Sequence, residues 1–513
     1  MKKKILWATL ALFAIILVAT SVNAVEVSNW EELKNALKGT EEQVKLVNDI
    51  TESTEAPETI VSLAGTKVLD LNGKTLKLAN AYFEITGSSK LTIDGNGTVI
   101  SDVRKTLDCY TGGTLNIKSG TFKNTHNDTV NNNKCGRIIG AWGTETDTGV
   151  ITKIDVAKGV KLISDYGYGI TVFEDSAKGS YNLTINTAAT IEAKQMAITI
   201  NGNVKATTGK VPNINIEEGS YLKSEEVAIY GAGYGEWVIE EGTEIIGEEA
   251  LTIKSGEFNI KGGTFKATGA YVENPVEKSN GAEDTGNAIN IISHSSYAGK
   301  ISVRILGKVN VESKNGHALY EKILKGTNLA VDSVEVYDGT YTGKIEAVKS
   351  ENLEQFIVAG DFSDELDEKY ISDGSEVIEV NGRKHYGLPY EITIDEDSKN
   401  IISVSKTTAI PGEKVNVILN ENKIKGEYEV KGLIIIDNRK NEKEVEGTSF
   451  EMPESDVTVK AVLKEITKEQ EPEQEAEKDT TPKTGALNVA IYTCIALGTI
   501  ALIGTVKSKN SKH

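Results

Sequence analysis

The chain is poor in the residues that usually build metal centres and disulfide frameworks. Its 513 residues include only three cysteines and five histidines, and these show no spacing typical of zinc ligands. No two aspartates are adjacent anywhere in the sequence. We therefore expect neither a metal site nor a bound cofactor.

Long helical patterns are also scarce. After Gly39, apolar residues do not recur with the helical period until a short stretch at 363–370. Instead, short segments of alternating polar and apolar residues are separated by Gly, Asn, Asp or Ser. This pattern is typical of β-strands joined by tight turns, so the sequence predicts an all-β fold.

Acidic residues are in strong excess, with a formal net charge of −19. The segment 1–24 and the tail after Thr484 each contain three lysines and no Asp or Glu. The part between them therefore holds 50 Lys and Arg against 75 Asp and Glu, a formal charge near −25. Such a surface argues against nucleic acid or anionic lipid as a partner, although solubility alone also accounts for it.

The N-terminus has the three parts of a secretory signal peptide. Three lysines follow Met1, an apolar run covers 5–19, and Val22 and Ala24 fit the small-residue rule at −3 and −1. We predict that the segment 1–24 is removed by cleavage between Ala24 and Val25. An uncleaved anchor is the alternative, but the run is shorter than the roughly 20 residues that a membrane span needs.

The C-terminus carries a second export feature. The stretch 487–506 is apolar and uncharged and is long enough to span a bilayer, and the lysines after it are typical of a cytoplasmic end. Just before the span, the sequence resembles the LPxTG sorting signal of Gram-positive surface proteins, with Thr in place of Leu, at Thr481, Pro482, Lys483, Thr484 and Gly485. The resemblance implies cleavage after Thr484 by a sortase and attachment to peptidoglycan. A plain membrane anchor is the alternative, and both interpretations place the segment 25–480 outside the cell.

A short amphipathic helix is expected over 29–38, at the start of the exported part. Ser28 and Glu31 have the spacing of a capping box, and Trp30, Leu33 and Leu37 fall on one helical face. Gly39 ends the helix. Within the segment 25–42, this helix would cover the open end of the structure that follows.

One local pattern recurs along the middle of the chain. It consists of an apolar residue, a spacer, a β-branched residue, two spacers, Gly, a spacer and an aromatic residue. It occurs at 115–122, 214–221, 251–258, 258–265 and 334–341. The marker glycines Gly219, Gly242 and Gly263 follow one another at short and nearly equal intervals.

A repeat this short, built from strands, predicts a solenoid whose stacked coils share one core. Glycine supplies the positive φ that the corners of such coils need. An array of sandwich domains is the alternative, whereas the leucine-rich repeat motif is absent from the sequence.

The segment 43–385 contains three motifs: Asp70–Leu76, Leu91–Thr98 and the Gly-Thr-Phe coils. In these motifs it resembles the right-handed parallel β-helix proteins of the pectate-lyase-like superfamily, especially their Firmicutes surface-protein branch. The segment 390–463 is similar to the B-repeat modules of internalin-like surface proteins, at Ala409–Val417 and Phe450–Val459.

The resulting organisation is a signal peptide (1–24), a cap helix segment (25–42), a right-handed parallel β-helix (43–389) and a small β-rich module (390–463). An acidic disordered stalk (464–484) and a membrane anchor with a basic tail (485–513) follow.

Cys109 and Cys135 are the two cysteines outside the anchor, and their separation in the sequence is about one coil of the repeat. Stacked coils place equivalent residues roughly 5 Å apart, a distance that suits a disulfide. The spacing therefore allows a Cys109–Cys135 bridge. Two reduced thiols are the alternative.

Catalytic residues are not readable in the sequence. The galacturonan hydrolases of the superfamily carry Asp-Asp, Gly-His-Gly and Arg-Ile-Lys motifs, whose nearest counterparts here are Gly316-His317-Ala318 and Arg137-Ile138-Ile139. Asp165, Glu174 and Asp175 form the nearest approach to a carboxylate cluster, with Arg137 expected about one coil away. Solvated surface charges are the simpler interpretation, so no catalytic residue is predicted.

Aromatic residues on Gly-rich corners are the candidate glycan contacts, because exposed rings on a rigid face stack on sugars. These are Tyr166, Tyr168, Tyr230, Tyr234 and Trp237. Packing of the rings at the corners is the alternative. We therefore expect a noncatalytic cell-surface protein that displays a β-helix to glycans or to host or neighbouring cells. A wall-bound polysaccharide lyase or glycoside hydrolase is the second hypothesis.

Overall fold

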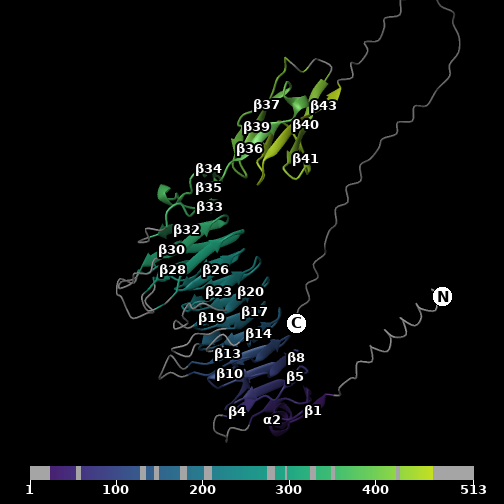
Figure 1. Cartoon of the computed structure of the whole chain (residues 1–513), viewed down its shortest axis with the longest axis vertical. Helices are drawn as coiled ribbons and strands as arrows, with labels where there is room; N and C mark the ends of the chain where they lie inside the picture. The colour runs from purple at the N-terminus through teal and green to yellow at the C-terminus, as the bar shows by residue number, and fades with distance from the viewer. Residues whose placement is uncertain are drawn as a thin grey trace, which may run out of the picture.

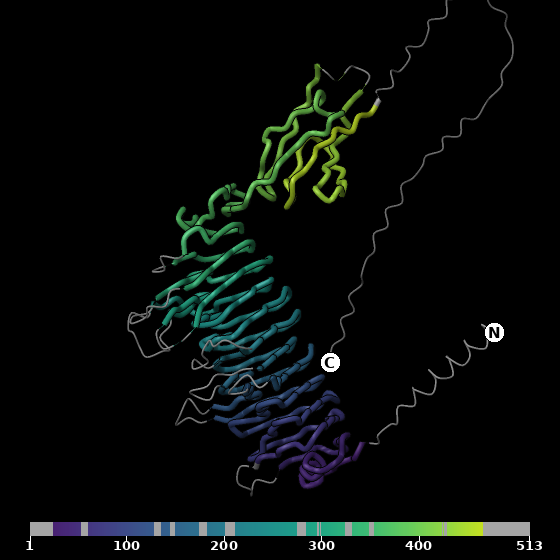
Figure 2. Tube along the Cα trace, in the orientation of Figure 1, coloured from purple at the N-terminus to yellow at the C-terminus, as the bar shows by residue number. Residues whose placement is uncertain are grey.

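The computed structural model describes residues 24–52, 59–127, 135–143, 149–173, 182–200, 211–273, 284–294, 297, 299–323, 331–347, 353–422, 424 and 428–465. These residues form a long stack of strand coils and a smaller β-rich unit beyond its last coil (Figure 1). The coils wind regularly about one axis (Figure 2). Parallel pairing between successive coils makes this an all-β parallel β-helix, as the repeat predicts.

The helix α2 (Trp30–Lys38) packs across the first coil. Its buried face consists of Trp30, Leu33, Ala36 and Leu37. The cap differs by one residue from the expected box. Asn29 is the N-cap and accepts a hydrogen bond from the Glu32 backbone N–H, while the Glu32 carboxylate accepts bonds from Ser28. The capping residues therefore lie one position further along the chain than predicted, with Asn29 in place of Ser28 and Glu32 in place of Glu31.

Each full coil contributes one strand to each of three faces. The first face is a 12-stranded parallel sheet. Its strands are β1 (Val25–Val27), β2 (Gln43–Leu46), β5 (Thr66–Asp70), β8 (Lys90–Asp94), β11 (Thr114–Ile117), β14 (Thr152–Val156), β17 (Leu183–Thr187), β20 (Asn213–Ile216), β23 (Glu236–Ile239), β26 (Gly256–Ile260), β29 (Ile301–Ile305) and β31 (Ser333–Val336).

The second face follows it in each coil. It contains β3 (Ile50–Thr51), β6 (Thr75–Leu78), β9 (Thr98–Ser101), β12 (Thr121–Asn124), β15 (Lys161–Ser164), β18 (Thr190–Ala193), β21 (Tyr221–Ser224), β24 (Glu244–Gly247) and β27 (Gly263–Ala267). The third face contains β4 (Thr59–Ser62), β7 (Ala81–Ile85), β10 (Lys105–Cys109), β13 (Arg137–Trp142), β16 (Tyr168–Phe173), β19 (Met196–Ile200), β22 (Val227–Gly231), β25 (Glu249–Ile253) and β28 (Ile289–Ser293).

Two long strands, β30 (Val309–Ile323) and β32 (Thr340–Ala347), run through both of these faces.

The core is a set of inward ladders in which like residues stack from coil to coil. On the first face one ladder joins strand partners in register, from Leu91 through Leu115, Ile154, Ile185, Ile214, Trp237, Phe258 and Val303 to Val334. Each coil is too small to enclose a core alone, and stacking joins the apolar faces into one. The predicted positive φ of the marker glycines is confirmed, for example at Gly120 with φ 108° and Gly339 with φ 122°.

The C-terminal end of the helix is closed by antiparallel strands. After the last parallel strand, β33 (Gly360–Phe362), the chain forms the 3-10 helix η2 (Glu368–Tyr370) and the hairpin of β34 (Glu376–Val380) and β35 (Arg383–Gly387). β35 pairs antiparallel with β33.

The second unit consists of two sheets around a separate core. The larger sheet has the order β38-β36-β43-β40-β41 and the smaller one β37-β39-β42. The strands are β36 (Tyr390–Ile394), β37 (Ile402–Val404), β38 (Thr408–Ala409), β39 (Lys414–Leu419), β40 (Tyr428–Asp437), β41 (Glu442–Glu446), β42 (Ser449–Glu451) and β43 (Val457–Glu465), with the 3-10 helix η3 (Glu396–Ser398) after β36.

Candidate binding face

The outer surface of the third face differs in chemistry from the other two. On the first face, small polar side chains hydrogen-bond to one another from coil to coil, as between Asp155, Asn186 and Asn215 at 2.7 Å each. On the second face, threonines occupy equivalent outward positions of β6, β9 and β12. The third face carries stacked aromatic rings that contact ion-paired and cationic side chains, so it is the candidate binding face.

A ladder of three aromatic rings lies at the carboxyl ends of consecutive third-face strands. Trp142 stacks between Tyr110 and Phe173, with ring centroids 5.3 and 4.7 Å apart and interplanar angles of 13° and 18°. Strand register explains the stack, because Trp142 pairs with Phe173 across β13 and β16. All three side chains are half-buried. We call Tyr110, Trp142 and Phe173 the outer aromatic ladder.

The buried ion pair of Arg137 and Asp108 lies next to the outer aromatic ladder and contacts its rings. The Arg137 guanidinium donates to both carboxylate oxygens of Asp108, at 3.1 Å from Nε and 2.7 Å from Nη2. It also lies over the Phe173 ring, 4.4 Å from the centroid. The Tyr110 hydroxyl donates to Asp108 at 3.0 Å, and burial together with this carboxylate raises the pKa of Tyr110 well above its ordinary value. Arg137 is 4% exposed and Asp108 is 0% exposed, so the pair holds the rings rather than meeting solvent.

Two tyrosines and a lysine form a second cluster further along the same face. Lys254 donates to the Tyr230 hydroxyl at 3.0 Å and lies over the rings of Tyr230 and Tyr297, 4.9 and 5.2 Å from their centroids. The two hydroxyls are 3.2 Å apart. A cation over aromatic faces adds roughly 0.5–2 kcal/mol of attraction, depending on its desolvation. This cluster therefore fixes Tyr230 against the wall of the helix.

A third cluster surrounds His317 on β30. The imidazole stacks on Tyr320, with centroids 4.6 Å apart, and meets the edge of Tyr271 at 5.1 Å. The buried Asp284 pairs with Lys322 at 2.7 Å. Burial is the main cause that raises the pKa of Tyr320, and the Asp284 charge adds to it. Burial likewise raises the pKa of Tyr271, so both tyrosine hydroxyls are neutral in this part of the face.

The five residues predicted to contact a glycan differ in how exposed their side chains are. Tyr166, on the corner between β15 and β16, is 42% exposed. Tyr168 and Tyr230 are half-buried, and burial raises the pKa of Tyr168 to about 12. Tyr234 is buried, and its hydroxyl donates to Glu257 at 2.8 Å. The prediction that Trp237 is a surface contact is wrong. Its side chain points inward and is 0% exposed in the core ladder.

Of the residues considered for catalysis, the two that the structure describes have different ionic partners. Arg137 is bound by Asp108, whereas Asp165 pairs with Lys123 at 3.0 Å. Glu174 and Asp175 lie outside the described residues. Within the described ranges, no group of three or more His, Cys, Asp or Glu side chains is placed to hold a metal ion.

The Cys109–Cys135 bridge that the spacing allows is not formed, and both buried thiols are free, which is the alternative. The register shows why: Cys109 lies opposite Ala141 of the next coil, so this coil is longer than the interval between the two cysteines. The Cys135 side chain lies near the Gln195 amide instead. Burial raises the pKa of the Cys109 thiol to about 12, so this thiol is protonated and unreactive at neutral pH.

The terminal signals fall mostly outside the described residues. Val25, which follows the predicted cleavage site at Ala24, is the first residue of β1. The segment 1–23, the sorting signal at 481–485 and the apolar stretch at 487–506 are not described. In the described part of the chain, no helix has the length and apolar character to cross a membrane.

Comparison with known proteins assigns the chain to no family. No family model matches the chain, and no curated protein matches it. Among solved structures, the SRRP of Lactobacillus reuteri 100-23 is similar, with a TM-score of 0.35 and 13% identity over 58% of this chain and 98% of that one.

Proposed function

We propose that this protein is a noncatalytic display protein, exported and held at the bacterial cell surface, whose third face binds a glycan. The observation that carries the proposal is the outer aromatic ladder. Its rings are half-buried on the outside of a rigid wall, where an aromatic side chain has no packing role inside the core. Recognition sites use such rigid rings because their contact area costs little conformational entropy.

The support beneath the ladder also favours binding. Arg137 and Asp108 hold Tyr110 and Phe173 in place through hydrogen bonds and a cation–ring contact. Pre-organised side chains lose less entropy when a ligand binds. Other ionic groups of the face are engaged with one another, as in the ion pair that Asp284 forms. This arrangement suits recognition of a neutral or weakly charged sugar surface more than proton transfer.

A glycan array read together with an activity panel tests the proposal. The full chain should be retained on a subset of glycans, and it should release no reducing or unsaturated ends from pectin, glycosaminoglycan or mucin. Trp142→Ala should weaken retention sharply. The matched control is Tyr221→Ala, a half-buried ring on the second face, which should leave retention unchanged. Turnover of any of these polymers would replace this proposal with a wall-bound lyase or hydrolase.

The anchoring part of the proposal rests on the sequence at 481–485 and needs its own test. Covalent sorting predicts that Thr484→Ala allows detergent to extract the protein from purified cell walls, whereas the unchanged chain resists extraction. Equal extraction of both would leave only a membrane anchor.

A further inference from the structure

His317 has an acceptor oxygen at each ring nitrogen. Nδ1 lies 2.9 Å from the Asn287 Oδ1 atom, and Nε2 lies 2.8 Å from the Glu346 Oε2 atom. The His317 residue is 4% exposed and Asn287 is 0% exposed, whereas the Glu346 side chain is 48% exposed. One side of this arrangement is therefore fixed inside the protein, and the other reaches solvent.

The identity of the Asn287 atom that faces the ring follows from its other bonds. The same Oδ1 accepts the His317 backbone N–H at 2.8 Å, and only an oxygen accepts that bond. The Nδ2 atom donates to the Asp284 backbone carbonyl at 3.2 Å. Rotating the amide by half a turn would break both bonds, so the oxygen stays toward the ring.

A neutral imidazole satisfies only one of these two acceptors, because it has a single N–H. The other nitrogen then directs a lone pair at an oxygen. A protonated imidazole donates at both nitrogens and satisfies both acceptors. When the proton is lost, the hydrogen bond to Glu346 is the one that breaks. The Glu346 carboxylate reaches water, whereas Asn287 is held in place by two further hydrogen bonds.

Charged and titratable groups from every neighbouring element act on the ring. Burial lowers the pKa of His317, the Glu346 and Asp284 carboxylates oppose this, and the Lys344 charge adds to it. The pKa of the ring lies below its ordinary value of 6.5, so the ring takes up its proton at a lower pH than a free imidazole does. The other groups around it are Lys322, which offsets Asp284 through their ion pair, and the neutral rings of Tyr320 and Tyr271.

We propose that His317 and Glu346 form an acid-closed latch between β30 and β32 on the third face. A proton taken up from solvent completes both hydrogen bonds of the ring and pins the Glu346 carboxylate to it. Loss of that proton frees the carboxylate. This inference does not depend on a glycan ligand.

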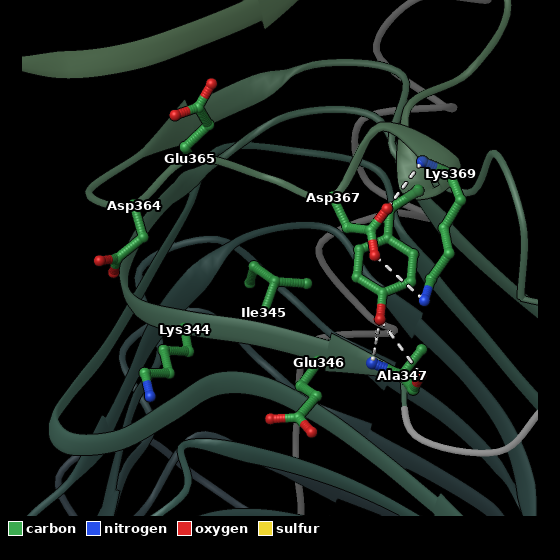
Figure 3. Close-up of a pocket in the computed structure, with 9 residues that line it drawn as sticks. Lys344, Ile345, Glu346, Ala347, Asp364, Glu365, Asp367 and Lys369 are labelled. Carbon is green, nitrogen blue, oxygen red and sulfur yellow. Dashed lines mark hydrogen bonds and ion pairs between the residues drawn. The ribbon is translucent and has the colours of Figure 1, made fainter.

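The latch faces a pocket of about 610 Å³ at the C-terminal end of the β-helix. Figure 3 shows Glu346 and Lys344 on one side of this pocket, with other charged side chains around the rest. Among these, Asp367 is paired with Lys369. A released Glu346 adds a carboxylate without a partner to this pocket, so the pocket is more negative when the latch is open.

The first measurement is the titration of His317 by NMR of the full chain with labelled histidine. Replacing Glu346 with Gln removes the negative charge that favours the protonated ring, so the midpoint should fall by about one pH unit. The matched control is Glu312→Gln. Glu312 lies on β30, the strand of His317, but it pairs with Lys266 at 3.3 Å. This substitution should leave the midpoint unchanged. An equal midpoint in the unchanged chain and in Glu346→Gln would overturn the latch.

The second measurement is hydrogen–deuterium exchange of the amides at 340–347, corrected for the intrinsic dependence on pH. The protection of the unchanged chain, divided by that of Glu346→Gln, should rise about tenfold from pH 8 to a pH well below the midpoints measured by NMR, which corresponds to one pKa unit of coupling between the carboxylate and the proton. Taking the ratio cancels the effect of burial on the ring, which is common to both chains. A ratio that does not change with pH would contradict the proposal, even if His317 itself titrates.

Discussion

Trp237 and Trp142 are both stacked tryptophans in the wall of one β-helix, yet one lies inside the wall and the other outside. Trp237 stacks on Phe258 in the core, with centroids 5.2 Å apart and an angle of 10°. Trp142 stacks on Phe173 on the outer surface, at 4.7 Å and 18°. The geometry of the two stacks is similar, so stacking itself comes from the strand register and says nothing about which side a ring occupies.

Side chains alternate between the two faces of a strand, and this alternation decides whether a ring lies in the core or on the outer surface. In β23, Trp237 and Ile239 point inward, and Glu236 just before them is exposed. In β13, Ala141 is the inward residue at the end of the strand, and Trp142 is therefore directed outward. A shift of one position along a strand moves an aromatic ring from the core to the surface.

The largest expected effect is that of Trp237→Ala. Removing a fully buried ring from a continuous ladder leaves a cavity next to Phe258, and such changes cost about 3–5 kcal/mol. Thermal unfolding followed by circular dichroism should show a clear fall in the melting temperature. Trp142→Ala is the matched control, and it should lower the melting temperature much less. Equal losses in the two variants would mean that the outer ladder is as structural as the inner one.

Asp108→Asn should have the next largest effect. The carboxylate neutralises a guanidinium that is almost fully buried, and removing one partner of a buried pair costs about 3 kcal/mol or more. Thermal unfolding measures this loss. The double variant Asp108→Asn with Arg137→Gln should recover much of the stability, because it leaves no unpaired buried charge. A double variant as unstable as the single one would show that packing, and not charge, holds the outer ladder.

Much of the fold was predictable because it depends on local rules that repeat. Marker glycines and aromatic residues recur at the coil length, and this recurrence identifies a solenoid without knowledge of any single contact. The helix α2 follows from its amphipathic face in the same way. The exact cap was not predictable, since Asn29 and Ser28 are neighbours and both are good cap residues.

The candidate face was harder to predict, because coil lengths vary. The step in sequence from Phe258 to its partner Val303 is more than twice as long as the step from Trp237 to its partner Phe258. An argument from one average coil length therefore placed Cys135 opposite Cys109, which is incorrect. The same argument failed to identify the outer aromatic ladder.

A signal for the outer aromatic ladder was nevertheless present in the sequence. Tyr110, Trp142 and Phe173 follow one another at nearly equal intervals. The first of these intervals is the same as the interval between Cys109 and its strand partner Ala141. Aromatic residues that recur at the local coil length, and not at the average one, would have identified the ladder.

Trp142→Ala should separate stability from binding. Its ring is half-buried and its loss removes two stacking contacts, each worth about 0.5–1.5 kcal/mol at most, so the chain should remain folded. Retention on any bound glycan should fall at least about tenfold, as expected when an aromatic anchor of an interface is truncated. Isothermal titration or array binding at several protein concentrations measures this. A folded variant that binds as well as the unchanged chain would remove the outer ladder from the binding face.

Tyr166→Ala should have the smallest effect on stability and is the most selective test of where the binding face ends. Tyr166 is 42% exposed at the corner that joins the second and third faces, and a substitution there should change the free energy of unfolding by less than about 0.5 kcal/mol. Any loss of glycan retention would then come from a contact with the ligand. A loss smaller than that of Trp142→Ala would place the corner at the rim of the site. Unchanged retention would confine binding to the outer aromatic ladder, and it would mean that exposure of a ring on a glycine-rich corner does not by itself mark a sugar contact in this protein.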